Sequence, residues 1–233
     1  MKNLKKINIL LIKGKWILFS VLFLIIIGVG FFLPKVIASN SPKTKYTVVV
    51  DAGHGGIDGG SVGKTSGISE AVLNLSYANC LREYLQDFGF NVVMTRATDG
   101  GLYSPIAKNK KKDDMKKRRE IIENSNADFV VSIHMNSYNA TSHGAQVFYG
   151  KDDEPSKTLA DNIQKYFIKY LEKARQETKV GDYYMLNAIK APSVLVECGY
   201  LSNPNEEALL LKEDYKKEVC YSILLGILQY LNW

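Results

Sequence analysis

Residues 46–67 read YTVVVDAGHGGIDGGSVGKTSG, and this stretch decides the fold class. It opens with a β-branched run, which is typical of a strand buried on both faces. Residues 52–67 contain seven glycines and are therefore expected to form a loop. Beyond the loop, residues 70–88 place apolar side chains three and four apart, which predicts an amphipathic helix with Ser69 as its N-cap. A strand, a glycine-rich loop and a helix in this order indicate the first unit of an α/β layer fold.

The same alternation of strands and helices continues to the end of the chain. Further strands are predicted at 90–95, 128–133, 145–149 and 193–196, and further helices at 113–126, 156–175 and 214–231. The strands are continuous apolar runs rather than alternating ones, as expected when helices cover both faces of a sheet. The sequence therefore predicts one α/β domain with a twisted, mostly parallel sheet, helices on both faces and no internal repeat.

Charge and composition exclude several classes of protein. The 233 residues carry 30 Lys and Arg against 24 Asp and Glu, a net charge of +6. Six lysines and no acid fall within residues 1–40, so the rest of the chain has no net charge, which argues against a nucleic-acid binder. A hydrophobic content of 46% excludes a disordered chain, and three cysteines exclude a disulfide-rich scaffold.

The N-terminal lysines flank an apolar segment. Residues 16–33 are 18 residues without a charge, close to the roughly 20 that a membrane-spanning helix needs. Because lysines precede this segment, the positive-inside rule places the N-terminus in the cytoplasm and the remaining chain outside. The segment is longer than a usual signal-peptide core, which favours a membrane anchor, while cleavage after Ala38 stays open. We expect a membrane segment at 1–39, a linker at 40–45 and a folded domain at 46–233.

Three predicted strands are followed by polar side chains that an apolar core does not need. His54 follows the first strand, His134 the third and Glu197 the strand at 193–196. Glu70 begins the helix after the glycine loop. The carboxyl ends of strands form the binding crevice of open α/β sheets, so we expect these four side chains to meet. Two histidines, a carboxylate and a water form a catalytic zinc site, and a second carboxylate near that water serves as general base.

These residues stand in motifs that resemble a known family. VVVDAGHGGIDGG, Glu70, ADFVVSIHMNS and PSVLVECGYLSNPNEEALL are similar, in order and spacing, to the motifs of zinc-dependent N-acetylmuramoyl-L-alanine amidases. The resemblance covers residues 46–232 and implies a zinc ion held by His54, Glu70 and His134, with Glu197 as the catalytic acid/base. It also implies hydrolysis of the peptidoglycan amide that joins the lactyl group of N-acetylmuramic acid to L-alanine.

Within that family, a short chain with an N-terminal membrane segment and no wall-binding repeats resembles the sporulation amidases. These enzymes strip peptides from muramic acid, a step toward muramic-δ-lactam in the spore cortex. We therefore expect peptidoglycan as substrate and an extracytoplasmic catalytic domain. Localisation is expected to depend on the N-terminal segment, on an activating or tethering protein partner, or on both, and such a partner would order the glycine loop 53–67. Asp51, Ser132 and Asn136 are candidates for fixing the ligands, whereas His143, in a polar turn, is not expected to bind metal.

Three other functions compete with this interpretation. Gly63-Lys64-Thr65 nearly matches a phosphate-binding P-loop, but the position that needs the first glycine holds Asp58, whose charge repels phosphate. A cysteine hydrolase would use Cys198, but no feature pairs a histidine with it, and buried structural cysteine is the commoner case. The third alternative is a non-catalytic muropeptide-binding module, which would not need Glu197.

A basic run from Lys108 to Arg119 contains eight bases and two acids. Such a run is typical of a solvated loop and helix face, and the alternative is contact with an anionic wall polymer or membrane surface. We expect the solvated face.

Overall fold

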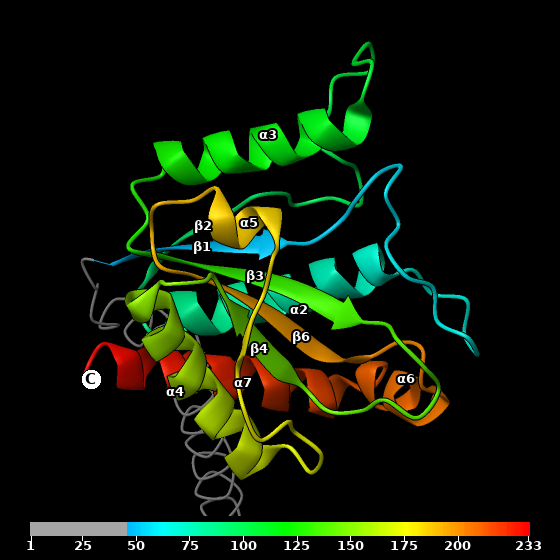
Figure 1. The fold of residues 1–233 in the computed structure, drawn as a ribbon, viewed down its shortest axis with the longest axis vertical. Helices are drawn as coiled ribbons and strands as arrows, with labels where there is room; N and C mark the ends of the chain where they lie inside the picture. The colour runs from blue at the N-terminus through cyan, green and yellow to red at the C-terminus, as the bar shows by residue number, and fades with distance from the viewer. Residues whose placement is uncertain (1–45) are drawn as a thin grey trace, which may run out of the picture. The chain divides into compact units, whose positions relative to one another are not determined.

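The computed structural model describes residues 46–233. The predicted membrane segment and linker lie outside these residues, among which no helix is long and apolar enough to cross a membrane. The elements (Figure 1) are β1 (Thr47–Ala52), α2 (Glu70–Asp87), β2 (Asn91–Met94), α3 (Lys110–Asn124), β3 (Phe129–Asn136), β4 (Gln146–Tyr149), α4 (Glu154–Tyr170), β5 (Lys179–Val180), α5 (Tyr184–Asn187), β6 (Ser193–Tyr200), α6 (Pro204–Leu210) and α7 (Glu213–Tyr230).

The strands form one mixed sheet in the order β2-β1-β3-β6-β4-β5. Neighbouring strands are parallel except for β4, which runs antiparallel to β6. The predicted α/β class is confirmed, and within residues 46–233 the sheet is mostly parallel, as predicted, with β4–β6 as its antiparallel pair. The cause of the antiparallel pairing is the connection between β3 and β4, which has only the nine residues 137–145. A parallel crossover needs a dozen or more residues, usually with a helix, so β4 runs back instead.

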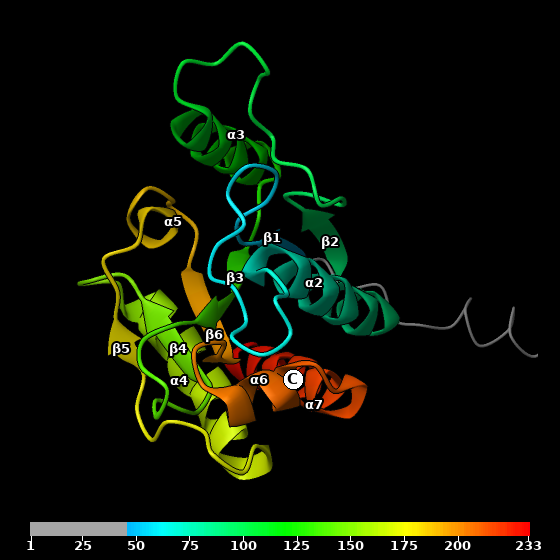
Figure 2. The same cartoon turned by 90° about the vertical axis from the view of Figure 1, so that its right-hand side faces the viewer.

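Helices cover both faces of the sheet (Figure 2). The larger core lies on the face covered by α2, α4 and α7, and it includes Val48 and Val50 of β1. On the opposite face, covered by α3 and α5, Val49 packs with Ile122 and Met185. All three valines are fully buried, so both faces of β1 serve a core. This arrangement accounts for the uninterrupted valine run in the sequence.

Several element bounds depend on local contacts that periodicity does not reveal. α3 begins three residues before its predicted start because the Asn109 side chain accepts a hydrogen bond from the backbone N–H of Lys112 at 2.9 Å. Ser69 is the N-cap residue of α2, as predicted, although its side chain makes no capping hydrogen bond. The sequence does not predict β5, α5 or α6, which are two, four and seven residues long, too short for a periodic signal.

β3 and β6 continue past the residues at which the sequence prediction stops them. β3 runs on through His134 to Asn136, and β6 runs on through Glu197 to Tyr200, because the two strands pair in parallel over this length. His134 stands opposite Glu197 in the register. Opposed residues of neighbouring strands share a sheet face, so both side chains lie on the face that α3 and α5 cover.

Candidate active site

Three side chains from separate elements converge at the carboxyl ends of β1 and β3. His54 follows β1 after a single intervening residue, Glu70 is the first residue of α2, and His134 lies in β3. Glu70 Oε1 lies 3.1 Å from His54 Nε2 and 2.9 Å from His134 Nδ1. One possible ligand atom from each residue lies within 4.8 Å of the other two. The structure thus brings together the three residues that the sequence singles out as metal ligands.

Glu70 is held in place as a carboxylate. Its Oε2 accepts a hydrogen bond from the backbone N–H of Ser61 at 2.9 Å, and its Oε1 accepts bonds from Asn74 Nδ2 and the backbone N–H of Met135, each at 3.3 Å. Burial alone would raise the pKa of Glu70, but the hydrogen bonds and charges of the two histidines hold that pKa well below its ordinary value. The side chain is therefore ionised and oriented at neutral pH.

Asp58 lies against the other nitrogen of His54. Its Oδ1 is 3.0 Å from His54 Nδ1, a contact without hydrogen-bond geometry, and its Oδ2 is 3.0 Å from the ammonium of Lys111. Burial lowers the pKa of His54, but interactions with Glu70 and Asp58 outweigh burial and raise this pKa above its ordinary value. Asp58 thus lies against the ring nitrogen of His54 that faces away from the cluster, the place from which a carboxylate orients a histidine toward a metal ion.

Two buried arginines hold the backbone that carries His54. Arg96 donates hydrogen bonds to the carbonyl groups of Ala52 and Gly53 at 2.9 Å each, and Arg118 donates to the carbonyls of Ala52 and His54. His54 has a φ of 60°, in the left-handed region that non-glycine residues rarely adopt. The arginines therefore stabilise a backbone turn that is unfavourable by itself.

The expected positioning residues Asp51 and Ser132 act on the cluster indirectly, through Arg118. Asp51 accepts hydrogen bonds from Ser132 Oγ and Thr95 Oγ1 at 2.6 Å each and forms an ion pair with Arg118 at 2.7 Å. Burial opposes ionisation, but Arg118 and the two hydroxyls lower the pKa of Asp51 to about 2. Asp51 therefore anchors Arg118, which in turn holds the His54 carbonyl. Asn136 contributes its backbone oxygen, which accepts from the N–H of Leu201 at 2.8 Å.

Two glycines leave room for the side chains of His134 and Glu70. A Cβ atom at Gly53 would lie 2.2 Å from His134 Nε2, and a Cβ at Gly60 would lie 2.5 Å from Glu70 Oε2. Both distances are shorter than the contacts that Cβ atoms make, so the imidazole and carboxylate reach their positions because these residues lack side chains.

Glu197 is buried beside the cluster, with 7% of its surface exposed. Its Oε2 is buried and has no hydrogen-bond partner within residues 46–233. Burial, together with the negative charge of Glu70, raises the pKa of Glu197 well above its ordinary value. A buried carboxyl without a partner costs free energy, which marks Glu197 as a functional group. The neighbouring Cys198 projects to the opposite face, into the larger core, where burial raises its pKa well above the ordinary value and disfavours a thiolate.

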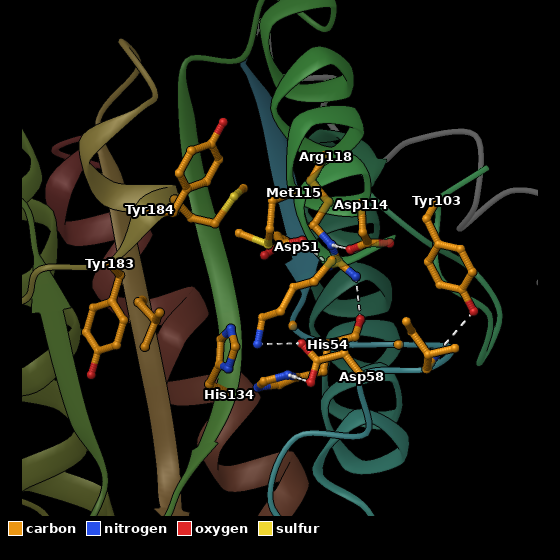
Figure 3. Close-up of a pocket in the computed structure, with 16 residues that line it drawn as sticks. Asp51, His54, Asp58, Tyr103, Asp114, Met115, Arg118, His134, Tyr183 and Tyr184 are labelled. Atoms are coloured by element: carbon orange, nitrogen blue, oxygen red, sulfur yellow. Dashed lines mark hydrogen bonds and ion pairs between the residues drawn. The ribbon is translucent and has the colours of Figure 1, made fainter. Parts of the chain in front are cut away.

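A cleft opens beside His54 and His134 on the face of the sheet that α3 and α5 cover (Figure 3). Its walls come from the loop before α3, from α3 itself and from the segment around α5, through Tyr103, Lys111, Met115, Arg118, Tyr183, Tyr184 and Met185. The ring of Tyr183 packs edge-on against the ring of Phe148, with 5.5 Å between the two ring centres. His143 lies elsewhere, in the loop after β3, with its Nδ1 3.1 Å from the carbonyl oxygen of Thr141.

Sequence reasoning missed α6 and the two glutamates that it buries. Glu207 accepts hydrogen bonds from the backbone N–H groups of Thr65 at 2.9 Å and of Ser66 at 2.6 Å. Glu206 accepts from the N–H of Gly144 at 2.8 Å. α6 therefore joins the glycine loop that leads to Glu70 with the loop that follows β3. In the sequence the two residues look like ordinary first-turn acids, so only the fold distinguishes them.

The residues of the basic run from Lys108 to Arg119 are not all exposed to solvent. Arg118 is 1% exposed and pairs with Asp51 and Asp114, and Lys111 lines the cleft. The prediction of a solvated face is therefore wrong for Arg118. No signal in the sequence KKRRE distinguishes this arginine from its neighbours.

The chain is similar in sequence and fold to known proteins. The family described as N-acetylmuramoyl-L-alanine amidase matches residues 48–229. The germination-specific N-acetylmuramoyl-L-alanine amidase of Bacillus subtilis is 36% identical over 234 residues, covering 94% of this chain and 96% of that protein. Among solved structures, the CwlD amidase of Clostridioides difficile in complex with the GerS lipoprotein has 39% identity and a TM-score of 0.77, covering 81% of this chain and 99% of that one.

A second solved structure, the catalytic domain of CwlV from Bacillus (Paenibacillus) polymyxa, has 34% identity and a TM-score of 0.71, covering 80% of this chain and 98% of that one. The family match spans most of the chain. Both solved structures have the same fold as this chain, and their sequences are 39% and 34% identical to it. The chain therefore belongs to the N-acetylmuramoyl-L-alanine amidase family.

Proposed function

We propose that this protein hydrolyses the amide between the lactyl carbonyl of N-acetylmuramic acid and the L-alanine of the stem peptide. The observation that carries the proposal is the cluster of His54, Glu70 and His134 with the unpaired carboxyl of Glu197 on the same sheet face. A cleft lined by His54 and His134 gives a glycan strand and its peptide access to the two histidines of the cluster.

The three clustered residues suit a zinc ion. Two imidazole nitrogens and a carboxylate are the donors of catalytic zinc sites, which leave a fourth position for water or substrate. Ligand atoms around a tetrahedral zinc ion with bonds of about 2.1 Å lie about 3.4 Å apart. The nitrogens of His54 and His134 lie 3.1 Å and 2.9 Å from Glu70 Oε1, close to that spacing. We assign His54, Glu70 and His134 as the zinc ligands.

Glu197 is assigned as the catalytic acid/base. When bound, zinc polarises the scissile carbonyl and lowers the pKa of water at the site toward about 7. Glu197 Oε2, which has no competing hydrogen bond within the described domain, accepts the proton of the attacking water. It then returns this proton to the departing amine of L-alanine. The same carboxyl carries the proton between these two steps.

The same observations weigh against the competing functions. A non-catalytic muropeptide-binding module gains nothing from a buried carboxyl without a partner, which is costly to maintain. A cysteine hydrolase needs a thiolate near a histidine, but Cys198 lies on the opposite sheet face from His134 and its pKa is raised.

The relatives indicate a role in spore-cortex maturation. One is named a germination-specific amidase, and CwlD was solved together with a lipoprotein. We propose that this protein removes stem peptides on the route to muramic-δ-lactam and that a protein partner binds it. Glu207 and Glu70 already anchor residues 61–66 of the glycine loop within this chain, so a partner is not needed to fix that stretch.

The proposed cellular location of the protein rests on its peptidoglycan substrate and on the apolar N-terminal segment. We propose that residues 1–39 anchor the protein in the membrane, that 40–45 form a linker and that the catalytic domain, 46–233, lies on the extracytoplasmic side. A reporter that is active only outside the cytoplasm, fused after Trp233, should be active. Activity of a cytoplasmic reporter at that position would contradict this topology.

Digestion of purified peptidoglycan tests the activity. The full-length protein in detergent, loaded with zinc, should release stem peptides with a free L-alanine amino group, identified by mass spectrometry. A chelator should stop the release and added zinc should restore it. Glycan fragments with intact peptides, or no products at all from zinc-loaded protein, would contradict the proposed reaction.

A further inference from the structure

The basic run around the start of α3 divides into two halves with different surroundings. In the second half, each exposed base has an acidic partner on the same helix: Lys116 with Glu120 at 3.5 Å, Lys117 with Asp113 at 3.3 Å, and Arg119 with Glu123 at 2.8 Å. In the first half, from Lys108 to Lys112, only Lys111 contacts a carboxylate in the part of the chain that the structure describes. Lysines at the start of a helix are unfavourable for the helix dipole, so the dipole does not account for their position.

Lys111 stands at the mouth of the cleft beside the metal cluster. Its ammonium lies 3.0 Å from Asp58 Oδ2, and the other oxygen of Asp58 lies 3.0 Å from His54 Nδ1. The Lys111 side chain is 68% exposed and lines the cleft. Asp58 thus holds a cation next to the site while leaving it open to solvent and to a ligand.

No acid lining this cleft is left without a cation. Asp51 and Asp114 both pair with the buried Arg118, at 2.7 Å and 2.6 Å, and Asp58 is shared between His54 and Lys111. On the outer wall, the ammonium of Lys110 lies 5.4 Å from the ring centre of Tyr103, which also lines the cleft. The most exposed charged group of the lining is therefore the ammonium of Lys111, with that of Lys110 nearby, and these ammonium groups favour an anionic group on the ligand.

The distance from the cluster suggests which ligand group that is. The two 3.0 Å contacts in series, with a carboxylate and an imidazole between them, put Lys111 Nζ within roughly 10 Å of His54 Nε2. An extended peptide advances about 3.3–3.6 Å per residue, so the second and third residues after a scissile amide at the cluster come within reach. The second residue of a stem peptide is a D-glutamate joined through its γ-carboxyl, which leaves its α-carboxylate free unless it is amidated.

We propose that Lys111 is a specificity-determining residue that binds a carboxylate of the stem peptide, foremost the α-carboxylate of the second residue. The inference rests on the proposed amidase function. Lys111 binds the charged group of the peptide, while the metal cluster and Glu197 act on the amide. Lys111 therefore contributes to substrate affinity and to the preference for acidic over amidated peptides.

The test compares two defined muropeptides that differ only in a free or amidated α-carboxyl on the second residue. The wild-type full-length protein, loaded with zinc, should have a KM for the acid about three- to fivefold below that for the amide, the upper range for an exposed ion pair. Lys111→Gln should lose this preference through a higher KM for the acid, and Lys111→Arg should retain it. Raising the salt concentration should narrow the preference in the wild type.

Lys116→Gln is the matched control, because it removes the same charge from a lysine on the same helix with a similar exposure, 71%, that does not line the cleft. It should keep the preference. Zinc content is measured in every variant, and a variant that lost zinc would place Lys111 with the metal site and overturn the proposal. Equal KM values for the two peptides in an active wild type would overturn the subsite alone and leave the amidase function standing. An equal loss of the preference for the acid in Lys111→Gln and Lys116→Gln would overturn the proposed subsite. It would indicate instead that the lysines of α3 attract anionic wall polymer in general.

Discussion

Glu207 connects the glycine loop before Glu70 to α6, and Glu207→Gln tests how much that connection stabilises the site. The carboxylate is 1% exposed and accepts hydrogen bonds from the N–H groups of Thr65 and Ser66. These bonds, outweighing the effect of burial, lower the pKa of Glu207 to about 2. A Cβ at Gly63 would lie 2.5 Å from Glu207 Oε1, so the loop packs directly on the carboxylate.

The expected loss follows from the hydrogen bonds. The amide of glutamine keeps one acceptor oxygen but turns an N–H group toward the second backbone donor, which leaves that donor unsatisfied. A buried donor without a partner costs about 1–3 kcal/mol. We expect Glu207→Gln to lower the free energy of unfolding by about 2 kcal/mol at pH 7, or the melting temperature by roughly 4–8 °C for a domain of this size.

The loss should depend on pH. Because the folded pKa of Glu207 lies below its ordinary value of 4.5, the carboxylate stabilises the fold fully above about pH 5 and progressively less as the pH falls from 4.5 toward 2. The difference between wild type and Glu207→Gln should therefore narrow over that range in urea unfolding curves.

Glu213→Gln is the control for this measurement, because it removes an exposed carboxylate that pairs with Lys216, and it should change stability by no more than about 0.5 kcal/mol. Amide hydrogen exchange at Thr65 and Ser66 should accelerate only in Glu207→Gln. Equal stability of wild type and Glu207→Gln at pH 7, or a difference that does not change on acidification, would refute the assigned role.

Three further substitutions test the support of the metal cluster. Asp58→Asn should weaken zinc binding by about tenfold, measured by competition with a chromophoric chelator, because carboxylates beside ligand histidines contribute 10- to 100-fold; unchanged affinity would contradict the orienting role. Arg118→Met should lower the free energy of unfolding in urea by about 3–5 kcal/mol, because two buried carboxylates lose their cation; a loss below about 1 kcal/mol would count against it. Gly53→Ala should abolish zinc binding in a chain that stays folded by circular dichroism, because the added Cβ would lie 2.2 Å from His134 Nε2; normal zinc content would exclude this crowding.

The sequence predicts the α/β class and most long elements because the strands are uninterrupted apolar runs and the helices are strongly periodic. It also selects His54, Glu70 and His134, since polar side chains next to buried strands have few structural reasons to be there. The extension of β3 and β6 past His134 and Glu197 depends on pairing between two strands whose opposed residues are 63 positions apart in the sequence, which no local pattern reveals.

The supporting residues are the part that local patterns do not reveal. Arg and Glu are residue types that usually lie on the exposed face of a helix. Arg118 and Glu207 are buried because of the neighbours that they contact in the fold. Asp58 stands four residues after His54 in a glycine loop, where an acid looks like an ordinary turn residue. Such contacts arise from tertiary packing and remain invisible to period, propensity and spacing.

The most direct test of the account separates metal binding from proton transfer. Zinc content and release of L-alanine-terminated stem peptides are measured side by side for wild type, His134→Ala and Glu197→Gln. His134→Ala should lose both zinc and activity. Glu197→Gln should keep a full zinc content and lose activity, because an amide cannot accept the proton of water. An equal loss of zinc in both variants, or peptide release by Glu197→Gln at the wild-type rate, would contradict the assignment of Glu197 as the acid/base beside a three-ligand metal site.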